Sequence, residues 1–181
     1  MTRYLTTGIP GVVVVEPEPF EDERGIFART WDVEEARAFG LDTRLSQCST
    51  SYNRRRGTLR GLHYQAAPFA ESKLVRCTSG AIYDIAVDLR EGSPTRLSWF
   101  GMELTSANRR ALFVPEGCAH GFVTITDDAE VYYQISAPHA PDAARGVRWD
   151  DPALRIEWPV TPVVMSERDA TLPVLAEARV S

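Results

Sequence analysis

The sequence has few of the residues that build metal sites, disulfide frameworks or nucleic-acid surfaces. Its 181 residues include 3 cysteines and 3 histidines, and no two cysteines form a C-x-x-C pair. Such widely spaced cysteines argue against a zinc site or a disulfide framework and suit the reducing cytoplasm. The net charge of −5 also argues against nucleic acid as a partner. The one dense basic run, R-R-R at residues 54–56, is typical of a solvated loop tip.

Long hydrophobic runs are missing as well. The apolar run at residues 11–15 is far too short for a signal peptide, and no stretch reaches the length of a transmembrane helix. With 44% hydrophobic and 25% charged residues, the composition is that of a soluble globular protein. We therefore expect one cytoplasmic domain over residues 1–181, large enough for a full core and without a membrane partner.

Lysine is the scarcest charged residue. Lys73 is the only one in the chain, and the other members of the Lys and Arg total of 20 are arginines. A compact amine with a tunable pKa differs from a guanidinium, so a single lysine among so many arginines indicates an amine with a specific task. An arginine-biased composition with one lysine left by chance is the alternative explanation.

Short strands bounded by glycine and proline account for most of the chain. Almost no helix among so many short strands predicts an all-β sandwich or barrel. Asp32 is expected to cap a short helix over residues 33–39, with Gly40 as its end. Residues 21–27 and 115–122 should be turns that lead into strands, and residues 138–162 should be loop-rich. The remaining strands are predicted at residues 12–15, 45–52, 57–65, 70–77, 81–89, 97–104, 111–114 and 131–135.

The densest chemistry lies in G-T-L-R-G-L-H-Y-Q, residues 57–65. In a regular strand, alternation would place Leu59, Gly61 and His63 on one face. Gly61 is typical of a bulge, or of a place where another group comes close to the backbone. His63 is a candidate proton acceptor, although a hydrogen-bonded core histidine is the commoner explanation for a histidine among apolar residues.

Six blocks follow one another along the chain: D-E-R-G-I-F, G-T-L-R-G-L-H-Y-Q, S-K-L-V-R, D-I-A-V-D-L-R-E-G-S-P-T, P-E-G-C-A-H-G-F and S-E-R-D. This ordered set covers nearly the whole chain and resembles the dTDP-4-dehydrorhamnose 3,5-epimerase family. The resemblance implies a jelly-roll (cupin-like) fold, a homodimer, and catalysis without metal or cofactor. It also implies a nucleotide-linked 4-keto-6-deoxyhexose substrate that is inverted at C3, C5 or both.

Epimerisation beside a ketone needs a base on one face of the sugar, an acid on the other, and a cation or donor at the enolate oxygen. The resemblance implies that His63 is the base and that Asp169 orients it. It implies further that Tyr133 donates the proton and that Lys73 stabilises the enolate. Tyr132 is the alternative donor, because neighbours on a strand face opposite ways and only one of the two can point into the barrel.

The ligand contacts also follow from the resemblance. Arg24 and Arg60 match positions that clamp a diphosphate, where a planar fork meets two oxygens. The other substrate-binding positions are Gln47, Ser49, His120, His139 and Arg168.

Several positions on the nucleotide side depart from the family's usual pattern. Arg29 stands where a glutamate is typical, Ser49 where an asparagine is, and Ala144 where a second glutamate is. His139 replaces an aromatic ring that would stack on thymine, although a flat imidazole can still stack. The proton-transfer residues are intact, so we expect the reaction type to be kept and the base preference to be altered.

Two other classes of function compete with the epimerase. A metal-dependent cupin oxygenase or isomerase needs about three clustered histidine and carboxylate ligands, and His63, Glu71 and His120 would be its minimal set. The paired H-x-H of many cupins is absent. A non-catalytic sugar-nucleotide binding module is the second alternative, but such a module has no need for a base and an acid on opposite faces.

Overall fold

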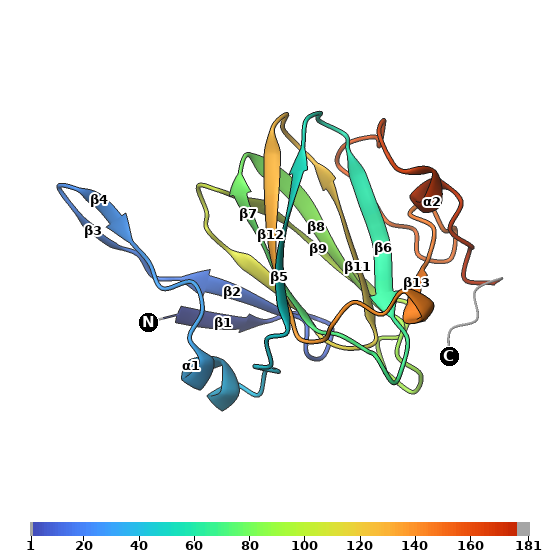
Figure 1. The fold of residues 1–181 in the computed structure, drawn as a ribbon, viewed down its shortest axis with the longest axis horizontal. Coiled ribbons are helices and arrows are strands. Elements are labelled where there is room, and N and C mark those ends of the chain that lie inside the picture. Colours follow the sequence, from blue (N-terminus) through green and yellow to red (C-terminus); the bar gives the residue numbers. More distant parts are fainter. Residues whose placement is uncertain (1, 177–181) are drawn as a thin grey trace.

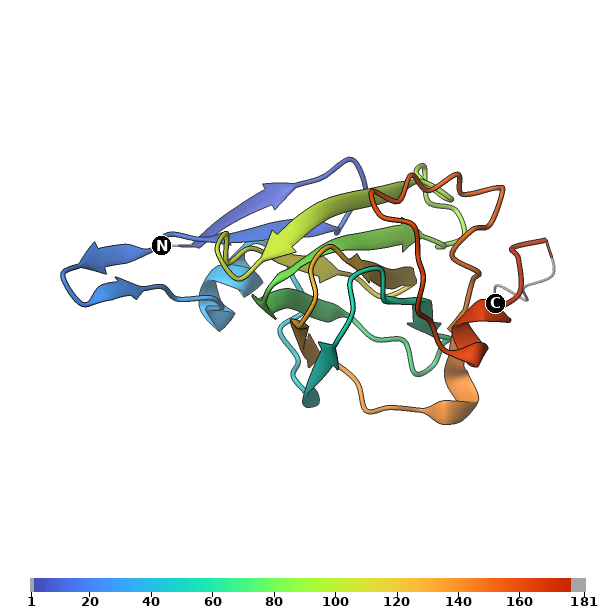
Figure 2. The ribbon, with the colours of Figure 1, turned by 90° about the horizontal axis from the view of Figure 1, so that it is seen from above.

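Two antiparallel sheets pack face to face in the computed structural model, which describes residues 2–176 (Figures 1 and 2). The larger sheet has the order β1 (Thr2–Thr6), β2 (Val13–Pro17), β10 (Ala111–Val114), β7 (Lys73–Ser79), β12 (Ala129–Ile135) and β5 (Gln47–Asn53). The smaller sheet has the order β13 (Ala144–Gly146), β6 (Leu59–Gln65), β11 (Cys118–Thr124), β8 (Ala81–Asp88) and β9 (Trp99–Thr105). This arrangement confirms the predicted all-β, jelly-roll fold class.

The helix predicted after residue 32 is α1 (Val33–Ala38). The Asp32 side chain accepts hydrogen bonds from the backbone N–H groups of Glu34 and Glu35, which satisfies two donors that the first turn leaves without partners. The chain leaves the helix through Gly40, whose φ of +89° favours glycine.

Four elements were not predicted from the sequence. They are β1, β3 (Phe20–Asp22), β13 and the short helix α2 (Glu167–Ala170). Each has at most 5 residues, which is too short for a period of alternating apolar residues to be visible. A 3-10 turn over Pro141–Ala143 also interrupts the segment predicted to be loop-rich.

The valine run near the start of the chain is explained by burial on both faces of β2. Val14 packs into the core between the two sheets, whereas Val13 and Val15 pack on the opposite face with Ala36 of α1. A strand covered on both sides is apolar at every position, so it shows no alternation. The helix α1 therefore covers one end of the larger sheet.

Strands β6 and β11 approach each other unusually closely at two glycines. A Cβ atom built on Gly61 would lie 2.6 Å from the Cα of Gly121, which is far inside normal contact. The pairing also shifts register here, because His120 lies opposite His63 while Phe122 lies opposite Arg60. The bulge and the close approach predicted at Gly61 are thus both present.

The bulge changes which side chains share a face. In a regular strand, residues three apart would point to opposite sides, yet Arg60 and His63 both line the same cavity. The expectation for a regular strand, with Leu59, Gly61 and His63 on one face, therefore does not describe β6.

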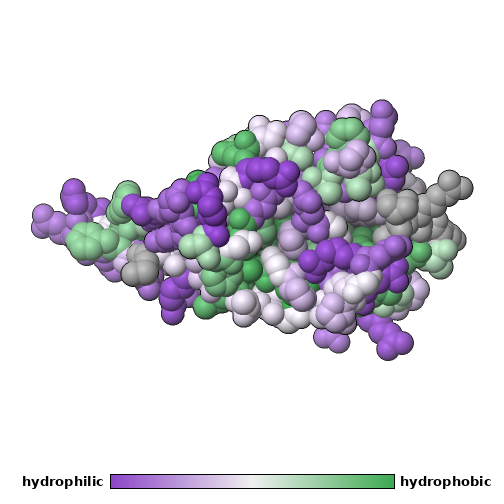
Figure 3. Space-filling view, turned by 90° about the horizontal axis from the view of Figure 1, so that it is seen from below, coloured by the Kyte–Doolittle hydropathy of each residue, from purple (hydrophilic) through white to green (hydrophobic). Residues whose placement is uncertain are grey.

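Residues 20–27 form a hairpin of β3 (Phe20–Asp22) and β4 (Gly25–Phe27), not a turn before a single strand. The hairpin projects from the two sheets (Figure 1). Phe20 and Phe27 are 66% and 73% exposed on it, and apolar atoms stand among hydrophilic ones on this arm in Figure 3. None of the helices in residues 2–176 has the length and apolar character needed to cross a membrane.

Candidate active site

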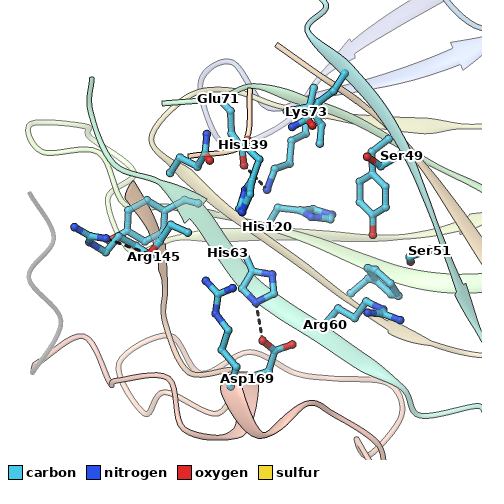
Figure 4. Close-up of a pocket in the computed structure, with 18 of the residues that line it drawn as sticks. Ser49, Ser51, Arg60, His63, Glu71, Lys73, His120, His139, Arg145 and Asp169 are labelled. Atoms are coloured by element: carbon cyan, nitrogen blue, oxygen red, sulfur yellow. Dashed lines mark hydrogen bonds and ion pairs between the residues drawn. The ribbon is translucent and has the colours of Figure 1, made fainter. Parts of the chain in front are cut away.

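A cavity of about 540 Å³ opens between the two sheets and gathers the scarcest residues of the chain. His63, His120 and His139, which are all the histidines in the sequence, line it together with Lys73, the only lysine. Figure 4 shows Lys73 on one side of this cavity and His63 on the other. The two come from different sheets, since Lys73 begins β7 and His63 lies on β6.

The His63 imidazole is held by a buried carboxylate from the C-terminal part of the chain. Its Nε2 lies 2.7 Å from Oδ1 of Asp169 in α2, and the Gly61 N–H donates to the other carboxylate oxygen at 3.3 Å. Burial opposes ionisation of Asp169, yet its pKa is lowered because His63, Gly61 and Ser166 hydrogen-bond the charged form. A carboxylate on Nε2 makes Nδ1 the proton acceptor of the ring.

A second histidine–carboxylate pair stands beside the first. His120 lies opposite His63 in the β6–β11 pairing, and its Nε2 is 2.7 Å from Oδ1 of Asp84 on β8. Burial raises the pKa of Asp84, which is fully enclosed. This pair was not predicted from the sequence, although Asp84 in the largely apolar run A-I-Y-D-I-A-V-D-L was a signal for it, because a buried charge is paired in native structures.

Tyr133, and not Tyr132, faces the cavity. Its ring meets the His120 ring edge-on, with centroids 6.1 Å apart, and Ser51 lies near its hydroxyl. Burial raises the pKa of this phenol, so it is a neutral O–H donor at neutral pH. Tyr132 lies on the other face of β12, near Arg76 and Cys48.

The cavity carries more basic than acidic side chains. Arg60, Lys73, Arg145 and Arg168 line it, against two carboxylates. Both carboxylates have a partner, since Glu71 lies 3.0 Å from the Lys73 ammonium and Asp169 holds His63. The excess of positive charge suits an anionic ligand. Arg60 is fixed by a 2.8 Å hydrogen bond from its Nε to the Asn53 side chain.

Most of the predicted ligand contacts also line the cavity. They are Gln47, Ser49, Arg60, His120, His139 and Arg168. Glu71, Ser51 and Arg145 line it too and were not predicted as ligand contacts. The sequence signal for Arg145 was only its place next to Ala144.

Arg24 lies elsewhere. It sits in the β3–β4 turn with its side chain 83% exposed and ion-paired to Asp22, and it does not line the cavity of its own chain. The expected clamp of Arg24 and Arg60 around one diphosphate is therefore not formed within a single chain, because the hairpin leads Arg24 away from the sheets (Figure 1).

The residues proposed for a metal site do not form one. His63, Glu71 and His120 all line the cavity, but no three histidine, cysteine or acidic side chains of residues 2–176 are grouped so as to hold a metal ion. Each has another partner instead, which is Asp169, Lys73 and Asp84 respectively.

Comparisons with known proteins point to a single family. The family model of dTDP-4-dehydrorhamnose 3,5-epimerase matches residues 6–177. A dTDP-4-dehydrorhamnose 3,5-epimerase of Sinorhizobium fredii is 43% identical over 98% of this chain and 92% of its own length. A dTDP-4-dehydrorhamnose 3-epimerase of Streptomyces niveus is 41% identical over 98% of this chain and 86% of its own.

A solved structure extends the similarity to three dimensions. The dTDP-4-dehydrorhamnose 3,5-epimerase of Bacillus anthracis, crystallised with TDP and PPi bound, superimposes with a TM-score of 0.93 at 38% identity, covering 97% of this chain and 100% of that one. Since the family model and the relatives each span nearly the full length, the chain belongs to the dTDP-4-dehydrorhamnose 3,5-epimerase family, as the ordered sequence blocks indicated.

Proposed function

We propose that this protein is an epimerase that inverts C3, C5 or both in a dTDP-linked 4-keto-6-deoxyhexose, using side chains alone. One observation carries the proposal: a carboxylate-held histidine and a neutral phenol line the same cavity from different sheets. A base and an acid on opposite walls are what inversion at carbon requires. Relatives named 3,5-epimerase and 3-epimerase are almost equally similar, so the proposal covers both outcomes.

The chemistry can be written with the residues in place. Nδ1 of His63 removes the proton from the carbon beside the ketone. The electron pair of that C–H bond forms the C=C bond of the enolate, while the π pair of the carbonyl moves onto the ketone oxygen. The Lys73 ammonium stabilises the resulting enolate, a contribution of the kind whose removal costs roughly 10²–10³ in rate. Tyr133 then donates its hydroxyl proton to the same carbon from the opposite face. Asp169 stabilises the imidazolium that the first step forms.

The diphosphate is assigned to two arginines of the cavity. Arg60 and Arg168 are the residues that we infer to bind the diphosphate, because guanidinium groups match phosphate oxygens in geometry and charge. The bound TDP and PPi in the Bacillus anthracis relative support a site of this kind.

We further infer that two copies of the chain associate and that Arg24 completes the site of the second copy. The projecting hairpin carries Arg24 between two exposed phenylalanines, Phe20 and Phe27. Apolar side chains exposed on an arm of this shape favour contact with another protein surface. Such a contact would bring Arg24 to a diphosphate that its own chain does not reach.

The base is tested with His63→Asn. This variant should lose solvent deuterium exchange into the sugar by roughly 10²–10⁴-fold, the contribution of a positioned general base, while it still binds dTDP. NMR of the 4-keto sugar nucleotide in D₂O measures exchange, and calorimetry measures binding. His139→Asn, in the same cavity, should keep the exchange rate at saturating substrate. Near-normal exchange in His63→Asn would show that another group is the base.

The acid is tested with the neighbouring tyrosines as a matched pair. Tyr133→Phe should retain proton abstraction, seen as deuterium exchange, and lose the inverted product, because only the donor is removed. Tyr132→Phe should behave as the wild type, since its ring faces away from the cavity. If Tyr132→Phe loses the inverted product while Tyr133→Phe still forms it, Tyr132 is the proton donor.

The nucleotide side is tested by calorimetric titration with dTDP, UDP, GDP and CDP. We expect weak discrimination, because Ala144 brings no acceptor to the cavity wall and Arg29 is paired with Asp32 outside it. Arg60→Gln should weaken all four ligands alike, since a phosphate contact does not read the base. A preference for dTDP of about a hundredfold or more, roughly 2.7 kcal/mol, would show that other residues rebuild a thymine site.

A further inference from the structure

Glu71 is the one acidic residue of the cavity without a part in the proposed proton transfers. Its Oε1 lies 3.0 Å from Nζ of Lys73, and the two side chains are only 9% and 12% exposed. Figure 4 shows this ion pair on the side of the cavity opposite His63 and Asp169. A carboxylate in a cavity that suits an anionic ligand opposes the ligand's charge, so its position calls for a specific explanation.

The backbone between the two residues is fixed by a separate set of hydrogen bonds. Ser72 donates its N–H to the Ser136 hydroxyl at 2.8 Å, accepts from the Ser136 N–H at 3.0 Å, and donates its hydroxyl to Asp42 at 2.9 Å. Because side chains alternate in an extended chain, anchoring Ser72 on the outer side directs both Glu71 and Lys73 into the cavity. The pair is thus held by the fold before any ligand arrives.

A second carboxylate lies near the same ammonium. Asp84 is fully buried and accepts from His120 through Oδ1, while its Oδ2 has no hydrogen-bond partner among residues 2–176. Lys73 is near enough for its charge to favour the ionised form of Asp84. A lysine has a long and flexible stem, so without a restraint its ammonium could approach Asp84 and leave the cavity wall.

We propose that Glu71 is a positioning residue that keeps the Lys73 ammonium at the cavity wall, where the ketone oxygen of the substrate is stabilised. The inference rests on the proposed epimerase function and adds a residue to it. Glu71 acts through Lys73 and adds nothing favourable of its own to ligand binding. Its carboxylate costs the ligand some electrostatic attraction and in return fixes the group that acts on the enolate.

The test is a double-mutant cycle with Glu71→Ala, Lys73→Ala and the double variant, measured by deuterium incorporation at varied substrate concentration. Glu71→Ala should lower kcat more than about threefold with KM within about twofold, because the interaction matters once the enolate forms. In the Lys73→Ala background the same change should alter kcat by less than about twofold, since residues that act as a unit are non-additive. Glu71→Gln, whose amide oxygen still accepts from Nζ, should retain more kcat than Glu71→Ala.

Glu34→Ala is the matched control, because Glu34 pairs with Arg37 on the surface of α1, and its kcat should equal that of the wild type. The positioning role is overturned if kcat of Glu71→Ala falls by less than about threefold, or if only its KM rises. It is also overturned if Glu71→Gln has a lower kcat than Glu71→Ala, or if removing Glu71 lowers kcat equally in the Lys73→Ala background. If the wild type exchanges deuterium and Glu71→Ala has the kcat of the wild type, this inference alone is overturned. No exchange by the wild type would overturn the epimerase proposal and this inference with it.

Discussion

The hydrogen bond between His63 and Asp169 joins parts of the chain that are 106 residues apart, and the cavity depends on it. Asp169 belongs to a helix of 4 residues, which is too short to be stable by itself. The Ser166 cap and the contacts of the carboxylate with His63 and Gly61 hold it against β6. The same contacts fix the imidazole, so the wall of the cavity and the orientation of the proposed base have one physical origin.

The two-sheet architecture explains how the proposed base and the proposed acid are kept apart. His63 and His120 come from adjacent strands of the smaller sheet, and Lys73 and Tyr133 come from adjacent strands of the larger one. A shared apolar core fixes the distance between the sheets, and close packing makes that distance hard to change. A flat ligand between them would meet imidazole on one side and phenol and ammonium on the other, as the proposed inversion needs.

Much of the fold could be predicted from local signals, whereas the site depended on pairings that local signals do not contain. The valine run of β2, the Asp32 cap and the glycine at position 61 each have a direct backbone or packing cause. The pairing of Asp84 with His120 depends on strand register. The position of Arg24 outside its own cavity depends on how the hairpin leaves the sheets. Neither is visible as a spacing in the sequence. The resemblance to the family supplied Asp169, and it could not state that Arg24 lies outside the cavity of a single chain.

In the proposed mechanism, carbon-bound protons of the sugar are exchanged with protein groups that equilibrate with water. The most direct measurement is NMR of the wild-type reaction with dTDP-4-keto-6-deoxyglucose in D₂O, which reads configuration and deuterium content at C3 and C5 together. The mechanism predicts one deuterium at each inverted carbon, delivered to the face opposite the lost proton. An inverted product that retains its original hydrogen, or a substrate that gains neither deuterium nor inversion, would contradict it.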